Sequence, residues 1–92
     1  MAAIPPAGLA ELRNDARDAY AKGQIAAAAG NQTAVLALAK ASGAQTDDDF
    51  LFAGLIHHAA GHLAAAASVL NDGLRVFPDS AALHENLAVI AL

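Results

Sequence analysis

The sequence of 92 residues contains no cysteine and no tryptophan, and only one tyrosine, one methionine and three prolines. Without cysteine the chain forms no disulfides, thiolate nucleophiles or thiolate metal sites. Five Lys and Arg residues stand against nine Asp and Glu, and the formal net charge is −4. Since no basic stripe is present to neutralise phosphates, we expect no nucleic-acid partner. The lack of cysteine fits a reducing compartment, and we expect a cytoplasmic protein.

A membrane-spanning helix would require a long stretch without charged residues. Residues 50–70 contain no Lys, Arg, Asp or Glu and are about long enough to cross a bilayer. Three His and two Gly residues interrupt this stretch, and a pair of helices explains it better, so we expect no membrane span. The N-terminus lacks the basic start and long apolar run of a secretory signal, and we expect residues 1–8 to form a flexible leader.

Alanine supplies most of the 57% hydrophobic fraction, and it is the strongest helix former. Apolar residues recur at helical spacing, and glycine or proline interrupts them at intervals. The interruptions are at Gly23, at residues 42–43, at Gly61 and at residues 77–80. We expect Ser80, the last of these, to cap the final helix. We therefore predict five helices, over residues 8–22, 24–40, 47–60, 62–76 and 81–92. The Gly30-Asn31 pair is a weak point that could bend the second helix.

Helices of about four turns joined by short turns prompt a search for an internal repeat. A frame of 34 residues that begins at Asp47 places apolar and small residues at the signature positions of a known repeat. These residues are Phe50, Gly54, Gly61, Leu63, Ala66, Leu70 and Pro78. The segment thus resembles the tetratricopeptide repeat (TPR) family. It departs from the family pattern at Ala53, His57 and Gly73, where Leu, Tyr and Ala are favoured.

Weaker matches flank this repeat. Residues 19–28 resemble the middle of a preceding repeat, and residues 86–88 resemble the first helix of a following one. The resemblance implies an all-α fold, a short right-handed solenoid of antiparallel helix pairs. We expect a repeat domain over residues 9–92. It comprises a degenerate repeat 9–46, the best-matching repeat 47–80 and a half repeat 81–92.

The resemblance also implies a function, because in TPR proteins the first helices of successive repeats line a concave face that binds a peptide or a helix. The corresponding residues here are Arg13, Arg17, Tyr20, Asp48, Leu51, Leu55, His58, Glu85 and Val89. Arg13 and Arg17 are spaced to hold an acidic peptide, or to pair with acids on their own helix. Leu51 and Leu55 favour an apolar ligand. We expect a protein-binding adaptor or scaffold.

The sequence does not point to catalysis, a metal or a cofactor. His57, His58 and His62 could suggest a metal site, but we expect Gly61 to end the helix between the last two. The Asp run at 47–49 does not alternate as calcium ligands do, and an acidic helix start explains it better. No nucleophile elbow, phosphate loop or dinucleotide fingerprint is present. We predict a protein that is not an enzyme.

Two other interpretations stay open. One is a regulatory or docking segment of a larger enzyme, such as a glycosyltransferase or a sulfotransferase that carries helical repeats. The other is a purely structural, self-associating module. We also expect a homo-oligomer formed through the C-terminal helix, because that helix presents Leu83, Leu87 and Ile90 with one acid and no base.

Overall fold

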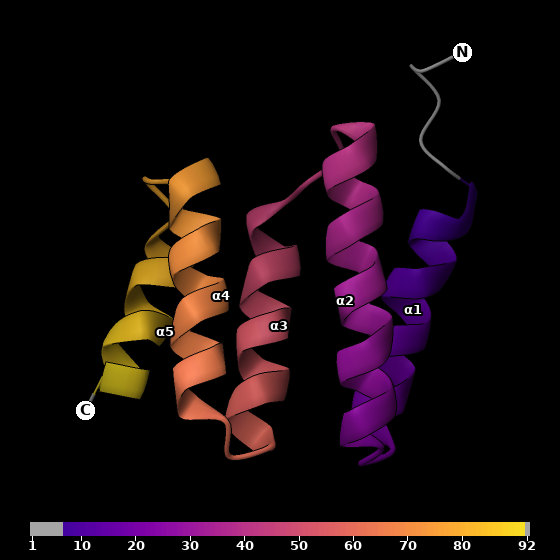
Figure 1. Cartoon of the computed structure of the whole chain (residues 1–92), viewed down its shortest axis with the longest axis horizontal. Helices are drawn as coiled ribbons and strands as arrows, with labels where there is room; N and C mark the ends of the chain where they lie inside the picture. The colour runs from indigo at the N-terminus through magenta and orange to yellow at the C-terminus, as the bar shows by residue number, and fades with distance from the viewer. Residues whose placement is uncertain (1–6, 92) are drawn as a thin grey trace. The chain divides into compact units, whose positions relative to one another are not determined.

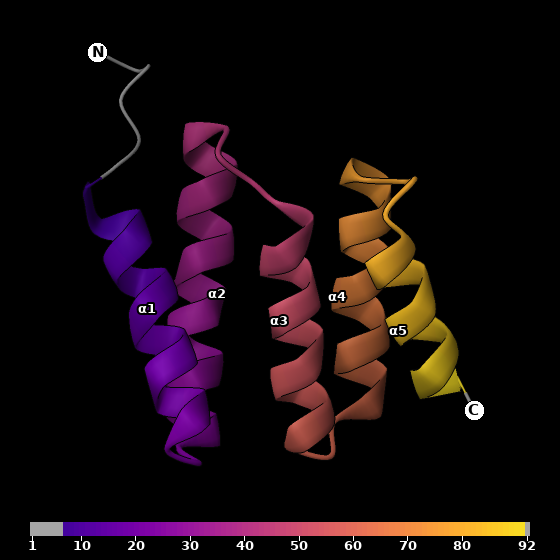
Figure 2. The same cartoon turned by 180° about the vertical axis from the view of Figure 1, so that it is seen from behind.

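The structure, a computed structural model, describes residues 7–91, which fold into α-helices joined by short turns (Figures 1 and 2). The helices are α1 (Ala7–Ala21), α2 (Ile25–Ser42), α3 (Asp47–Ala59), α4 (Leu63–Val76) and α5 (Ala81–Ala91). The all-α prediction is confirmed, and every helix begins and ends within two residues of its expected bounds. Within residues 7–91 no helix combines the length and the apolar character needed to cross a membrane.

The chain divides into two compact units between Thr46 and Asp47. The N-terminal unit contains the antiparallel pair α1 and α2, and the C-terminal unit contains α3, α4 and α5. The division falls at the expected boundary between the first and second repeats. Ala7, expected in the leader, belongs to α1, as does Gly8, the first residue of the expected helix. Residues 1–6 and Leu92 lie outside the described residues.

Glycines in the left-handed conformation end three of the helices. Gly23, Gly43 and Gly61 have φ angles of 75°, 69° and 79°, which side chains disfavour but glycine adopts readily. After α3, the amide of Gly61 donates to the carbonyl of His58, and the amide of His62 donates to that of His57. These bonds satisfy carbonyls at the helix end. The predicted stops at all three glycines are confirmed.

Gly30, the weak point considered above, does not interrupt α2. The helix runs unbroken from Ile25 to Ser42, and Gly30 lies on its exposed side. The buried face of α2 comprises Ala28, Gln32, Val35 and Ala39, which follow the helical spacing on both sides of the glycine. Packing of this face therefore outweighs the low helix propensity of one exposed glycine.

The N-terminal unit has a small core. Leu9 of α1 packs with Val35 and Ala39 of α2, and all three are nearly or completely buried. The partly buried hydrophobic residues around them are Leu12, Leu38 and Ala44. Alanine at many of the contact positions lets the two helices approach closely, but it removes little apolar surface from water.

In the C-terminal unit, α4 packs against both α3 and α5, which also contact each other. Two glycines permit the close approaches. A Cβ on Gly54 of α3 would lie 2.8 Å from Cδ2 of Leu70 on α4. A Cβ on Gly73 of α4 would lie 2.7 Å from Cβ of Phe50 and 3.0 Å from Cδ1 of Leu83. Gly54 therefore lies where α3 packs closely against α4.

Ser80 joins the starts of α3 and α5. Its Oγ donates to Oδ2 of Asp47 at 2.8 Å and accepts a bond from the amide of Leu83 at 3.3 Å. The second bond is a helix N-cap, because it satisfies an amide that has no partner within the helix. The prediction that Ser80 caps the last helix is confirmed. The first bond holds α3 and α5 together at their N-terminal ends.

We expect Ser80→Ala to lower the free energy of unfolding by about 0.5–2 kcal/mol, the usual cost of losing an N-cap. Circular dichroism during urea unfolding measures this loss. Ser68→Ala is the matched control, because Ser68 is exposed inside α4 and alanine raises helix propensity there. Equal stability of the two variants would show that the Ser80 bonds contribute nothing.

Candidate functional site

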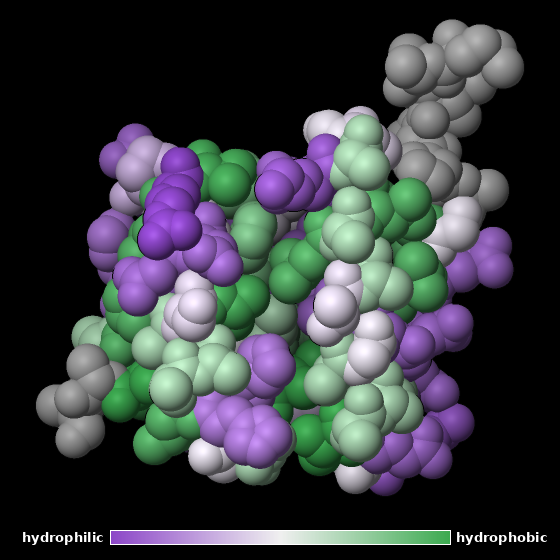
Figure 3. All heavy atoms as spheres, viewed as in Figure 1, coloured by the Kyte–Doolittle hydropathy of each residue, from purple (hydrophilic) through white to green (hydrophobic). Residues whose placement is uncertain are grey.

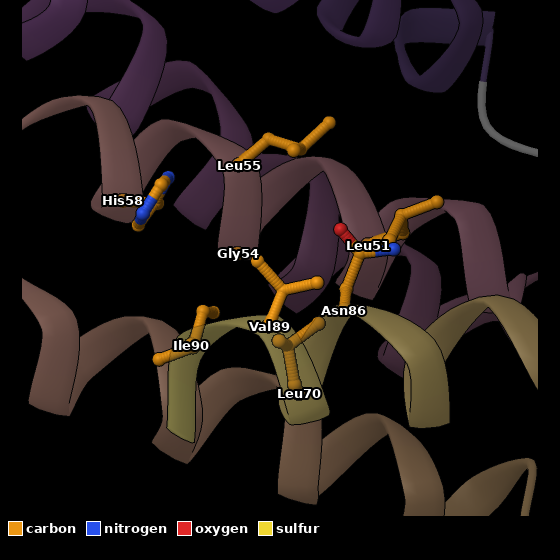
Figure 4. Close-up of a pocket in the computed structure, with 8 residues that line it drawn as sticks. All are labelled: Leu51, Gly54, Leu55, His58, Leu70, Asn86, Val89 and Ile90. Atoms are coloured by element: carbon orange, nitrogen blue, oxygen red, sulfur yellow. The ribbon is translucent and has the colours of Figure 1, made fainter. Parts of the chain in front are cut away.

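A pocket opens between α3 and α5 in the C-terminal unit (Figure 4). Its lining residues are Leu51, Gly54, Leu55 and His58 from α3, Leu70 from α4, and Asn86, Val89 and Ile90 from α5. We call it the α3/α5 pocket. The space between its walls, about 250 Å³, includes open solvent, so the enclosed part of the pocket is small.

The lining of the α3/α5 pocket is mainly apolar, and part of it is exposed. Leu55 and Val89 are 39% and 61% exposed, so apolar side chains on both walls of the pocket are in contact with water. Leu70 is completely buried and forms the floor between the two helices. The polar side chains are those of His58, which is exposed, and Asn86, whose Nδ2 donates to the carbonyl of Ala82 at 2.9 Å.

Four of the residues expected to bind a peptide meet in this pocket, namely Leu51, Leu55, His58 and Val89. Asp48 and Glu85 are exposed, and they lie one helical turn before Leu51 on α3 and Val89 on α5, respectively. They lie beside the pocket and do not line it. The resemblance to the tetratricopeptide repeat thus selected every lining residue that α3 contributes, apart from Gly54.

The other three expected residues lie on α1, in the N-terminal unit. Arg13 is half-buried, and its Nη2 donates to the carbonyl of Ala44 at 3.0 Å. This bond ties α1 to the segment that follows α2. Arg17 is exposed and Tyr20 is half-buried. The sequence did not indicate that the guanidinium of Arg13 bonds to the backbone carbonyl of Ala44.

The residues expected to mediate self-association face largely inward. Leu83 is completely buried and lies beside Gly73 of α4, so its side chain belongs to the core and not to a docking surface. Leu87 and Ile90 are half-buried, and Ile90 lines the α3/α5 pocket. Self-association through α5 stays a prediction. Leu83 cannot belong to the self-association surface, because it is completely buried.

Gly54, Leu70 and Asn86 are the pocket residues that sequence reasoning missed. Gly54 and Leu70 were identified only as signature positions of the repeat. In the structure they meet where α3 packs on α4, and the same contact forms the floor of the pocket. The signal for Asn86 was its place three residues before Val89, which puts both on one face of a helix. Ile90 was assigned to the surface of an oligomer instead.

The histidines do not assemble into a metal centre among the described residues. His57 is half-buried, whereas His58 and His62 are exposed on either side of the turn at Gly61. Within residues 7–91 no three His, Cys, Asp or Glu side chains gather closely enough to hold a metal ion. His84 makes a local bond instead, with its Nε2 at 2.8 Å from the carbonyl oxygen of Pro78.

Ion pairs in both units are exposed. Lys22 lies 2.8 Å from Asp18 on α1, and the hydrogen bond to this carboxylate raises the pKa of Lys22. Arg75 lies 3.0 Å from Asp72 on α4. Hydrophilic side chains gather over the end of α4 that leads to α5 (Figure 3). Exposed pairs of this kind stabilise a fold little, and neither contributes to the α3/α5 pocket.

Comparison of the chain with models of known protein families, with characterised proteins and with solved structures finds no match.

Proposed function

We propose that the chain is a protein-interaction module of the tetratricopeptide type, and that it binds an apolar side chain of a partner protein in the α3/α5 pocket. The observation that carries this proposal is the pocket itself, where side chains expected to face a ligand surround a common space. Exposed Leu55 and Val89 would lose contact with water when a partner docks. Such burial is the main source of affinity in a small interface.

The packing of the C-terminal unit supports the repeat assignment. Gly54 and Leu70 make contact between α3 and α4, Gly61 forms the turn, and Ala66 is completely buried. The ring of Phe50 packs edge to face on that of Phe77, with centroids 6.3 Å apart. In this proposal α3 and α5 are the first helices of successive repeats, and the pocket between them lies on the concave side.

We also propose that this adaptor is cytoplasmic and is not an enzyme. The described part of the pocket offers one imidazole and one amide among apolar groups. General acid and base catalysis needs two titratable groups that converge on a reacting atom. The pocket therefore supplies surface for binding rather than groups for chemistry.

Selection from a displayed library of random peptides against the full chain tests the proposal. We expect recovered peptides to bind Val89→Asn about 5- to 30-fold more weakly, because roughly 1–2 kcal/mol of apolar contact is lost. Val76→Asn is the matched control, since Val76 is 45% exposed but lies outside the pocket. Fluorescence anisotropy of labelled peptides measures both affinities. Failure to recover any peptide, or equal binding to both variants, would contradict the proposal.

A further inference from the structure

The charges of the C-terminal unit are strongly asymmetric. This unit contains one basic residue, Arg75, and six acidic ones, for a formal charge of −5 with His neutral. The acids are Asp47, Asp48, Asp49, Asp72, Asp79 and Glu85. The N-terminal unit has four basic residues against three acids, so the acidic excess of the chain belongs to the unit that contains the α3/α5 pocket.

The six acids also gather at one end of the C-terminal unit. They lie in the first turn of α3, in the second half of α4, in the turn after it and in the first half of α5. Figure 1 shows that the start of α3, the end of α4 and the start of α5 lie at the same end of this unit. The bond between Ser80 and Asp47 confirms that the starts of α3 and α5 meet. The opposite end carries His57, His58 and His62 and no acid.

The α3/α5 pocket lies next to the acidic end. Glu85 precedes Val89 by four residues, which is about 6 Å along a helix axis. Asp48 precedes Leu51 by three residues on the facing helix α3. Both acids are exposed. Part of the acidic run stabilises the start of α3 through the helix dipole, but Glu85 lies beyond the first turn of α5.

We propose that the α3/α5 pocket takes a cationic segment of a partner protein. One apolar side chain of this segment enters the pocket, and Lys or Arg residues within about three positions of it face Glu85 and Asp48. That spacing follows from the distance above and a rise of roughly 3.3 Å per extended residue. This inference rests on the proposed function, since it requires that the pocket bind a peptide. It fixes both the chemistry of the partner and its orientation.

The peptides recovered in the selection described above test the inference through their composition. We expect Lys and Arg to be enriched within three positions of a large apolar residue, and Asp and Glu to be depleted. We also expect binding to weaken when salt is raised from 50 to 300 mM, since ions screen exposed charges over about 10 Å at 0.1 M salt. Recovered peptides without basic enrichment would overturn the inference and leave the proposed function standing. Recovery of no peptide would overturn both.

Removal of one charge locates the interaction. Glu85→Gln should weaken binding of a selected Lys- or Arg-containing peptide about two- to fivefold in 50 mM salt, as expected for an exposed pair. Asp79→Asn removes the same charge from an exposed position in the turn before α5 and should leave binding within about 1.5-fold. Equal effects of the two variants would show that only net charge matters and would overturn the orientation proposed here.

A second copy of the chain is the competing occupant of the pocket. Sedimentation equilibrium of the chain alone distinguishes it. A dimer that Val89→Asn dissociates, and Val76→Asn does not, would overturn the proposal of a cationic partner. A chain that stays monomeric while it binds the selected peptide would support that proposal.

Discussion

Replacing Leu70 with alanine is expected to lower the free energy of unfolding by about 2–5 kcal/mol. Leu70 is completely buried, and its side chain fills the space that Gly54 leaves on the facing helix. The other large side chains of this core, Phe50, Phe52, Ile56 and Leu83, are themselves buried, so none of them can fill the cavity without opening another. Urea unfolding followed by circular dichroism measures the loss.

Leu63→Ala is the control for this change, because it removes the same atoms from the same helix at a site that is 49% exposed. We expect it to cost less than about 1 kcal/mol. A double variant tests the contact itself: Gly54→Ala should destabilise the wild-type chain but stabilise the Leu70→Ala chain, where its methyl group occupies the cavity. The same effect in both backgrounds would contradict the contact between Gly54 and Leu70.

Gly73→Ala is expected to destabilise the protein by about 1–2 kcal/mol, although the tetratricopeptide pattern favours alanine at this position. A Cβ there would lie 2.7 Å from Cβ and 2.8 Å from Cγ of Phe50. Because Cβ of Phe50 is fixed to the backbone of α3, the clash can be relieved only by moving a helix. Overpacking of this kind costs roughly 1–3 kcal/mol, which exceeds the gain of up to about 1 kcal/mol in helix propensity.

Gly30→Ala gives the opposite sign and serves as the control for Gly73→Ala. Gly30 also lies inside a helix, but a Cβ there would meet no atom within 4 Å. Only the helix propensity changes, so we expect this variant to gain about 0.5–1 kcal/mol. Thermal and urea unfolding of the two variants measure the contrast. A stabilised Gly73→Ala chain would mean that α3 and α4 are farther apart than in the structure.

Local signals in the sequence predicted the helices well. Gly23, Gly43 and Gly61 end helices for a reason that each residue carries alone, since only glycine adopts the left-handed conformation without strain. Ser80 was recognisable as a cap from its place before an apolar run. Gly30 was harder to interpret, because the outcome depends on whether the faces on both sides of it are buried, and only the packed structure shows that.

The candidate site was predicted only in part, because the sequence does not show which helix faces are buried in the packed structure. The resemblance to the tetratricopeptide repeat grouped Leu51, Leu55 and His58, and all three line the α3/α5 pocket. Neither this resemblance nor helical spacing shows which faces of α1 and α5 are covered by neighbouring helices. Leu83 was therefore expected at an interface although it lies in the core, and Arg13 was expected in a groove although it donates to Ala44.

The bond between Ser80 and Asp47 joins residues 33 positions apart, and it closes a loop that contains the whole of α3 and α4. Helix α4 packs against α3 and α5, its neighbours in the sequence. Each of these pairs can form as a helical hairpin, because only a short loop has to close. The contact between α3 and α5 then follows without a further search. Contact order in the C-terminal unit is therefore low, which is the condition for rapid folding. The α3/α5 pocket has walls from both α3 and α5, so the surface proposed to bind a partner exists only when all three helices of the unit are packed together.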